Sequence, residues 1–427
     1  MRPRHLLLFA GLVVFFVAVF LAMGTPYSTR LLVEATAYAL VALGLNIQFG
    51  YGGLFNFGIM GFLMVGGVAA VTVSYPVNAA FWQSDGPLML GRVLLAAVLG
   101  GVLVWAARKV DRLGITGGWR IAAITIAWFI AYIGYRTQID PAAAYIESTS
   151  GWIGGFGLHP VLGWAFGGIL CAALAFVIGK ITLGLRSDYL AIATIGISEI
   201  VRSFVKNLDW LTRGTLTVSP VPWPVPRPAD YQASGVDNVL SFIYARASFL
   251  VIVAIILVIA FILMQRAYSG PWGRMMRAIR DNHIAASSMG KNVKARQLEV
   301  FMLGSALMGI GGAILVSFVQ VLDPSGYQPI DYTFLVWVML IVGGSGNNWG
   351  AVFGALFIYA VYQLSAPASL WLFEQVSALG AQIGWGEIPN ADSRSQQVRF
   401  VLLGIVITLA LRYAPKGIIP EVVRRQG

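Results

Sequence analysis

The sequence has few charged residues. Asp, Glu, Lys and Arg make up 11% of its 427 residues, against roughly 25% in an average soluble domain. A chain so poor in charge cannot cover a globular surface with solvated groups, and 58% of its residues are hydrophobic. The deficit argues against a soluble enzyme, a nucleic-acid-binding module and a disordered chain. It favours a polytopic α-helical membrane protein, and the length allows about ten to twelve spans of roughly 20 apolar residues each.

Cysteine and histidine are also scarce, and the motifs of catalysis are missing. The one cysteine, Cys171, can form no internal disulfide and is expected to be a small buried hydrophobic residue. The three histidines are scattered, and the sequence holds no GxxxxGK[ST] phosphate loop, no HExxH and no GxSxG. We therefore expect no ATPase site of the chain's own, no catalytic residues, no cofactor and no metal.

Long apolar runs recur along the chain, and a window of about 19 residues separates twelve of them. The first run follows Arg2, Arg4 and His5, as in a signal peptide, but its length favours a retained helix. Two of the runs are short or polar, so the sequence predicts ten to twelve crossings. The runs cover about 6–23, 31–46, 57–75, 89–106, 120–136, 159–181, 189–205, 247–265, 299–320, 332–345, 350–366 and 397–413.

Basic residues outnumber acidic ones by 29 to 18, which gives a net charge of +11. In a membrane protein such an excess is typical of loops on the cytoplasmic side, and it need not indicate nucleic-acid binding. With twelve crossings, most lysines and arginines fall on one side when the N-terminus is cytoplasmic. We therefore expect a multi-pass protein of the cell inner membrane with both termini in the cytoplasm, surrounded by membrane lipid and without a nucleic-acid partner.

One long segment, 207–246, is rich in proline and contains SPVPWPVPRP. Proline at this density opposes a helix and favours an extended chain. A loop of this length is usually either functional or disordered. We expect an external loop, for which docking of an external partner and a passive linker are equally open interpretations.

Two apolar stretches, 44–62 and 340–355, are interrupted by glycines and amides. An amide at membrane depth is costly unless it is hydrogen-bonded, so these side chains should face protein or water. Glycine-interrupted segments in both halves of a chain point to a transporter's substrate path, whereas single glycines more often serve close helix packing. The predicted pathway residues are Asn46, Gln48, Gly50, Gly53, Asn56, Phe57, Gly343, Gly344 and Ser345.

Charged residues inside the apolar runs are few. Glu34 lies in the second run. Glu199 and Arg202 lie three residues apart in the seventh, close enough on one helix face to pair. We expect this pair to be a structural lock in preference to a proton path, and no series of carboxylates suggests coupling to protons or sodium.

The basic loop 266–298 has the signals of an amphipathic helix. Pro271 can begin a helix and Gly290 can end one. Apolar residues recur between them at helical spacing, so we predict one helix of about 18 residues. A basic helix lying on anionic lipid is one interpretation. The small residues from Ala285 to Ser288 favour the other, docking to a partner protein, because they allow close approach.

Five patches of the sequence resemble the permease subunit of branched-chain amino acid ABC importers. They follow one another in consistent order from about residue 30 to 421. The stretch DYLAIATIG resembles the longer of the two permeases that such importers usually pair. The patches are GLNIQFGYGGLFNFG, LRSDYLAIATIGISEIVRSFVKN, PWGRMMRAIRDNHIAASSMGKNV, VGGSGNNWGAVFGA and VRFVLLGIVITLALRYAPKGIIPE.

The resemblance implies a single transmembrane permease domain over 1–427 that translocates branched-chain or related amino acids without changing them chemically. It implies four kinds of contact: a second related permease, two ATP-binding cassette subunits, an external substrate-binding protein and lipid. Within a cytoplasmic coupling region, 267–297, it implies that the contacts to the ATPase are made by Arg277, Ala278, Arg280, Asp281, Ala285, Ala286 and Gly290.

The sequence departs from this family's pattern in three places. Residues 85–157 insert one or two spans and a basic loop, and 367–396 insert a further external loop. Ile59 stands where a histidine is common. Amides or urea are alternative substrates, and a stand-alone secondary transporter is the rival class, although neither coupling carboxylates nor a repeated pore motif supports it.

Overall fold

The computed structural model describes residues 3–113, 116–382 and 388–421. These residues fold into helices joined by turns, with two isolated β-bridges. Within the described ranges nine helices are long and apolar enough to cross a membrane, and two further apolar helices, Ile59–Ser74 and Ile330–Gly343, are shorter. The predicted all-α polytopic fold is thereby confirmed.

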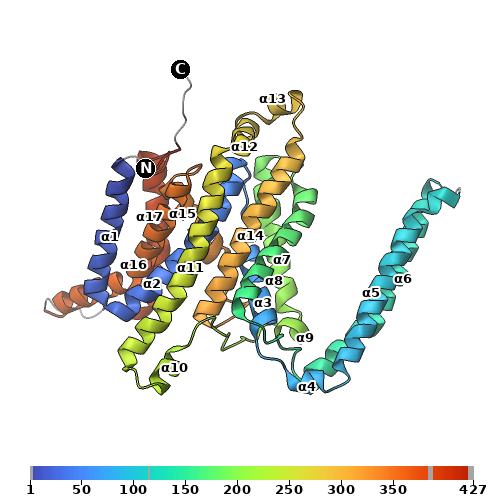
Figure 1. The fold of residues 1–427 in the computed structure, drawn as a ribbon, viewed down its shortest axis with the longest axis horizontal. Coiled ribbons are helices and arrows are strands. Elements are labelled where there is room, and N and C mark those ends of the chain that lie inside the picture. Colours follow the sequence, from blue (N-terminus) through green and yellow to red (C-terminus); the bar gives the residue numbers. More distant parts are fainter. Residues whose placement is uncertain (1–2, 114–115, 383–387, 422–427) are drawn as a thin grey trace.

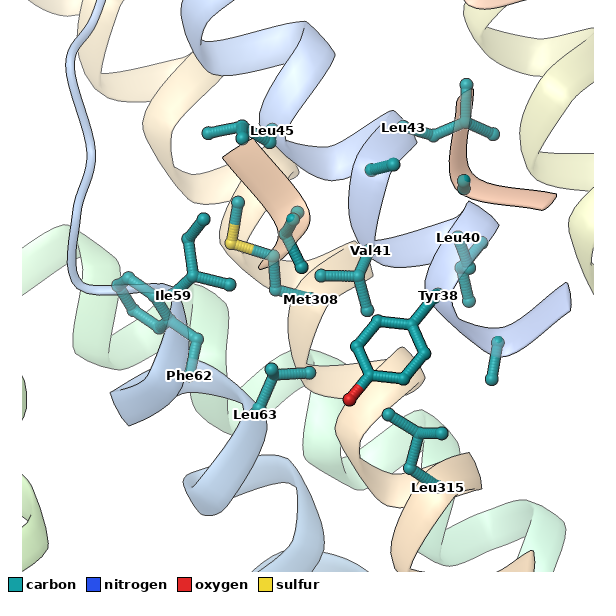
Figure 2. Packing of buried hydrophobic residues seen from close by; sticks show 14 of the residues in the cluster. Tyr38, Leu40, Val41, Leu43, Leu45, Ile59, Phe62, Leu63, Met308 and Leu315 are labelled. Atoms are coloured by element: carbon teal, nitrogen blue, oxygen red, sulfur yellow. The ribbon is translucent and has the colours of Figure 1, made fainter. Parts of the chain in front are cut away.

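Four helices form the most tightly packed part of the bundle: α2 (Thr25–Leu45), α3 (Ile59–Ser74), α7 (Pro160–Thr182) and α14 (Val293–Val319). Figure 2 shows Met308 of α14 among side chains of α2 and α3. The helices touch through glycines, because a Cβ built on Gly66 would lie 2.0 Å from the carbonyl oxygen of Gly309. Membrane helices associate by such close packing, since lipid leaves little hydrophobic driving force between them.

Other helices of the bundle pack around the first four. On α2 pack α1 (Pro3–Met23), α11 (Asn238–Ser269), α15 (Leu335–Gly343) and α16 (Asn348–Gln382). The short helices α12 (Pro271–Asp281) and α13 (His283–Ser288) follow α11, and α17 (Ala391–Tyr413) packs on α16. Phe9 of α1 makes edge-on ring contacts with Trp349 and Phe353. The start of α1 and the end of α17 lie at the same end of the bundle as α12 and α13 (Figure 1), as an even number of passes requires.

A helical hairpin stands apart from the bundle (Figure 1). It consists of α5 (Gly86–Arg108) and α6 (Gly118–Thr149), which pack on each other, with η2 (Val110–Leu113) near the tip. The segment 85–157 thus contains two helices, as expected of the insertion. Its base is tied to the bundle by α4 (Ala79–Trp82), α9 (Asp209–Thr212) and a hydrogen bond from Ile153 N to Trp210 O of 3.0 Å.

The proline-rich segment 207–246 is less of a loop than predicted. It contains α9 and α10 (Pro228–Ala233), and α11 already begins at Asn238. The extended part between them packs on the end of the bundle: Val218 N donates to Leu322 O at 3.0 Å, and the Trp223 ring stacks on Phe318 at 5.7 Å. The prediction of an extended chain is right for this central part and wrong for the helical flanks.

The expected external loop at 367–396 is largely helical. α16 continues through Pro367 to Gln382, and α17 starts at Ala391. The prediction of a loop is therefore wrong for 367–382 and 391–396, while 383–387 lie outside the described residues. An interior proline is tolerated in membrane helices because neighbouring groups satisfy the carbonyl that it frees.

Candidate coupling elbow and broken-helix core

The centre of the bundle contains an interrupted helix. α2 passes into a π-helical turn, η1 (Asn46–Tyr51), and residues 52–58 follow without regular structure before α3 begins. At 1.5 Å per residue, the 16 residues of α3 span only about 24 Å, less than the roughly 30 Å of a bilayer core. The irregular segment completes the crossing. Gly52, Leu54, Asn56 and Gly58 are buried and Gly53 lines a cleft, in keeping with the rule that unwound backbone at membrane depth is covered by protein or lines a cavity.

Every amide predicted to need a partner in this segment has one. Asn46 donates to Asn348 Oδ1 at 3.0 Å and accepts from Gly346 N at 2.8 Å. Gln48 donates to Phe301 O at 2.8 Å, and Asn56 donates to Gln48 Oε1 at 2.8 Å. All three side chains are fully buried. The bonds join the broken segment to α14 and to the turn between α15 and α16.

The two glycine-rich stretches meet, although they are about 300 residues apart. A Cβ on Gly50 would lie 2.5 Å from Gly346 N, and one on Gly344 would lie 2.3 Å from Ile419 O. A Cβ on Gly343 would lie 2.1 Å from Gly350 O. Glycine is needed at these positions for close backbone packing. Their role in a substrate pathway stays a prediction, as does that of Ser345, which is half-buried.

An aromatic cluster borders the broken segment, and Phe57 is its one member among the residues predicted from the sequence. Phe57 stacks on Trp337 of α15 with ring centroids 4.7 Å apart, and Phe49 meets the same indole edge-on at 4.9 Å. Trp337 Nε1 donates to Asn56 O at 3.0 Å. Phe55 is 36% exposed. α15, with η3 (Ile330–Phe334) before it, thereby holds the irregular chain 52–58 in place.

The coupling region forms two short helices where one was predicted. α12 begins at Pro271 and ends at Asp281, and α13 spans His283–Ser288. Asn282 breaks the predicted 18-residue helix, because its side chain caps α13 by accepting from Ala285 N at 3.0 Å. Gly290 follows α13 with φ +75°, so the predicted ends hold. We call α12 and α13 together the elbow.

Arg280 ties the elbow to the core. Its Nη1 contacts Glu421 Oε2 at 2.9 Å and also donates to Gly50 O of the broken segment. Burial alone would lower the pKa of Arg280, but the hydrogen bonds and charges of Glu421 and Asp281 raise it above the ordinary value. The residue was predicted to face an ATPase subunit, whereas its side chain, 22% exposed, faces its own chain.

The outer face of the elbow is open. Ala278, Asp281 and Ala285 are exposed, and Ile284 and Met289 expose 69% and 80% of their surfaces. Ala286, predicted to be a contact, is buried instead. Arg277 is half-buried and covers the ring of Tyr268 at 4.5 Å. Small and apolar residues ringed by charge suit a protein partner.

A cleft of about 990 Å³ lies beside the elbow. It is bounded by α13, by Gly53 on the broken segment and by the turn between α7 and α8 (Ser187–Lys206). A Cβ on Gly53, where φ is +66°, would lie 3.2 Å from the Arg280 side chain. Gly53 is the one predicted pathway residue among the lining residues of this cleft.

The predicted ion pair on α8 forms. Arg202 Nη1 lies 3.2 Å from Glu199 Oε2, and its Nη2 donates to Ser325 O at 3.3 Å. The contacts connect α8 to the turn before η3. Because 42% of the Glu199 side chain is exposed, the pair contributes little to stability by itself.

A bundle of apolar helices with an interrupted helix at its centre and an open elbow at one end defines a membrane transport protein. The model of the protein family described as branched-chain amino acid transport system / permease component matches residues 27–152 and 88–411. The chain belongs to this family and is a permease component of a transport system.

Curated relatives agree over most of the chain. A probable branched-chain amino acid transport permease protein LivM of Methanocaldococcus jannaschii is 24% identical over 388 residues, which cover 90% of each chain. The high-affinity branched-chain amino acid transport system permease protein LivM of Escherichia coli is 26% identical over 302 residues, 66% of this chain and 70% of the relative. No solved structure gives a significant match.

Proposed function

We propose that this permease is the membrane-spanning subunit of an ATP-driven ABC importer and that it translocates branched-chain amino acids. Its relatives carry that substrate in their names, and so does the family description. The sequence has no phosphate loop, so ATP hydrolysis falls to two cassette subunits. A second related permease and an external binding protein complete the importer.

The observation that carries the proposal is the elbow. Its outer face is free, and its inner face is fixed to the broken segment through Arg280. A cassette that holds α13 in a groove would move α12, and Arg280 would transmit that displacement to Gly50. The motion is a rigid-body shift that opens the spans alternately to each side.

This assignment sets the orientation. The elbow and both described ends of the chain face the cytoplasm, and the protein lies in the cell inner membrane. Basic residues gather at this end of the bundle, and cytoplasmic loops are enriched in Lys and Arg. They lie at the α5–α6 tip, between the elbow and the first turn of α14, and at and after the end of α17: Lys109, Lys291, Lys294, Arg412 and Lys416. The proline-rich segment then faces the external binding protein.

The test of the docking face is a steric block. We expect Ala285→Trp to lose co-purification of the cassette subunits and ATP-dependent uptake into proteoliposomes, because Ala285 lies on the open face of α13. The matched control is Ala80→Trp on α4, which is also exposed but lies at the opposite end (Figure 1). Uptake by the purified chain in liposomes that hold no ATPase subunit would refute the importer function in favour of a secondary transporter.

Substrate class is tested by competition. Uptake of labelled leucine by the complete importer is expected to be reduced by excess isoleucine or valine and left unchanged by urea or short amides. The reverse pattern would contradict branched-chain amino acids as the substrate while leaving the importer mechanism intact.

A further inference from the structure

A polar pocket of about 330 Å³ opens at the end of the bundle opposite the elbow. The first turns of α2, the second half of α16 and the first turns of α17 form its walls. The volume is within the roughly 300–1,000 Å³ range of small-molecule sites. Neither the elbow nor the broken segment contributes a lining residue, so this pocket is separate from the sites described above.

One wall of the pocket holds a buried carboxylate. The Glu34 side chain is 5% exposed, and its Oε1 accepts from Arg30 Nε at 3.0 Å. Its Oε2 accepts from Tyr359 OH at 2.6 Å and from Gln363 Nε2 at 3.4 Å. Ionisable groups inside membrane proteins are costly and mark substrate paths more often than lipid-facing positions. Glu34 thus places a carboxylate, paired on one side with Arg30, on the wall where an ammonium group could contact it.

The pocket also has an arginine with an unused donor. Arg399 of α17 lines it, and its buried Nε has no hydrogen-bond partner among the described residues. Arg30, which has 55% of its side chain exposed, lines it as well. A buried donor without an acceptor is unfavourable, and a carboxylate is the acceptor that matches a guanidinium best.

Part of the remaining lining is apolar. Leu31, Ala366, Pro367 and Leu370 form a surface without charge between the polar groups. The pocket therefore combines a site for a carboxylate, a site for an ammonium group and a wall for an aliphatic side chain.

We propose that this pocket binds a free α-amino acid with a branched aliphatic side chain, with its carboxylate on Arg399, its ammonium group near Glu34 and its side chain against Leu370. The proposal deepens the proposed function and rests on it for the choice of side chain. The pocket lies at the external end of the bundle, so an incoming solute reaches it before the broken-helix core. Its lining therefore helps to determine which solutes are transported.

The experiment measures equilibrium binding of labelled leucine to the full permease complex in lipid nanodiscs, without the external binding protein. Arg399→Ala is expected to weaken binding about tenfold or more, the usual effect of losing a hydrogen bond to a charged group. The matched control Arg394→Ala removes an exposed arginine from the same helix and is expected to leave binding unchanged.

A second variant separates recognition from folding. Leu370→Ala removes part of the apolar wall and enlarges the pocket, so the preference is expected to shift from leucine toward the larger phenylalanine. A structural defect would instead lower binding of both solutes alike. Equal loss for both solutes in every variant, or unchanged leucine binding in Arg399→Ala, would overturn the proposal.

Uptake by the complete importer, measured in parallel, distinguishes the two proposals. Leucine uptake with binding insensitive to both variants would refute the pocket and retain the importer. Absence of branched-chain amino acid uptake, with leucine binding that still depends on Arg399, would refute the proposed substrate of the importer and retain the pocket.

Discussion

Breaking the tether between Arg280 and Glu421 is expected to uncouple ATP hydrolysis from transport. The two side chains are 22% and 16% exposed, and Arg280 also holds Gly50 O. A hydrogen bond to a charged group that is largely shielded from solvent contributes about 1.5–3 kcal/mol to the stability of the contact. A loss of about 2 kcal/mol shifts the equilibrium between attached and detached elbow roughly 30-fold. Arg280→Gln should therefore let the elbow move without carrying the broken segment with it.

The assay compares solute imported with ATP hydrolysed by the complete importer in proteoliposomes. We expect ATPase activity to persist in Arg280→Gln while the ratio of import to hydrolysis falls by about tenfold or more. Arg412→Gln, an exposed arginine at the same end of the bundle, is the control and should keep the ratio of the unaltered chain.

A double-mutant cycle decides whether the pair itself is responsible. Glu421→Gln alone should lower the ratio less than Arg280→Gln, because it leaves the bond to Gly50 O in place. The two changes together should be little worse than Arg280→Gln alone, because the pair is already lost in that variant. Additive losses in the ratio of import to ATP hydrolysis would refute transmission through this contact. An unchanged ratio with a lowered melting temperature would do the same and leave Arg280 a purely stabilising residue.

Three further outcomes follow from the packing. Gly66→Ala forces a methyl group against Gly309 and should cost about 1–3 kcal/mol in thermal unfolding, whereas Gly101→Ala, with open space around it, should leave the melting temperature unchanged. Asn46→Leu strands two buried hydrogen-bonding partners, and its melting temperature should fall by the equivalent of about 1–3 kcal/mol. Glu199→Gln should lower the free energy of unfolding by less than about 1 kcal/mol. It should leave the pH profile of uptake unaltered, because a structural ion pair transfers no proton; a shifted profile would indicate a proton path.

The parts of the fold that the sequence predicted are those with local causes. Apolar run length predicts a span wherever it occurs, and Pro271 and Gly290 set the ends of the elbow through backbone geometry alone. The need of Asn46, Gln48 and Asn56 for partners was equally predictable, since an unsatisfied buried amide is costly in any fold.

The remaining features depend on residues far away in sequence. Arg280 faces inward because Glu421 lies beside it in the fold. The two residues are far apart in the sequence, and no pattern around Arg280 indicates that they are in contact. Trp337 became part of the core because the broken segment needs a partner for its Asn56 carbonyl. The division of the elbow at Asn282 did carry a local signal, because asparagine favours the N-cap position.

The elbow and the external pocket are joined by a single rigid element. α2 has 21 residues and is about 30 Å long. Glu34 lies near its middle, and η1, which Arg280 contacts through Gly50, follows directly after its end. Its C-terminal half is buried on all sides, so it cannot bend without disturbing the core.

Coupling between two sites is reciprocal, so a displacement of the elbow that alters the pocket implies that solute in the pocket also shifts the position of the elbow. Arg280→Gln, which releases the cytoplasmic end of this connection, should therefore abolish any effect of cassette binding on leucine affinity while leaving the affinity of the isolated pocket intact. A leucine affinity that responds to the cassettes equally with and without Arg280 would show that the signal travels by another route.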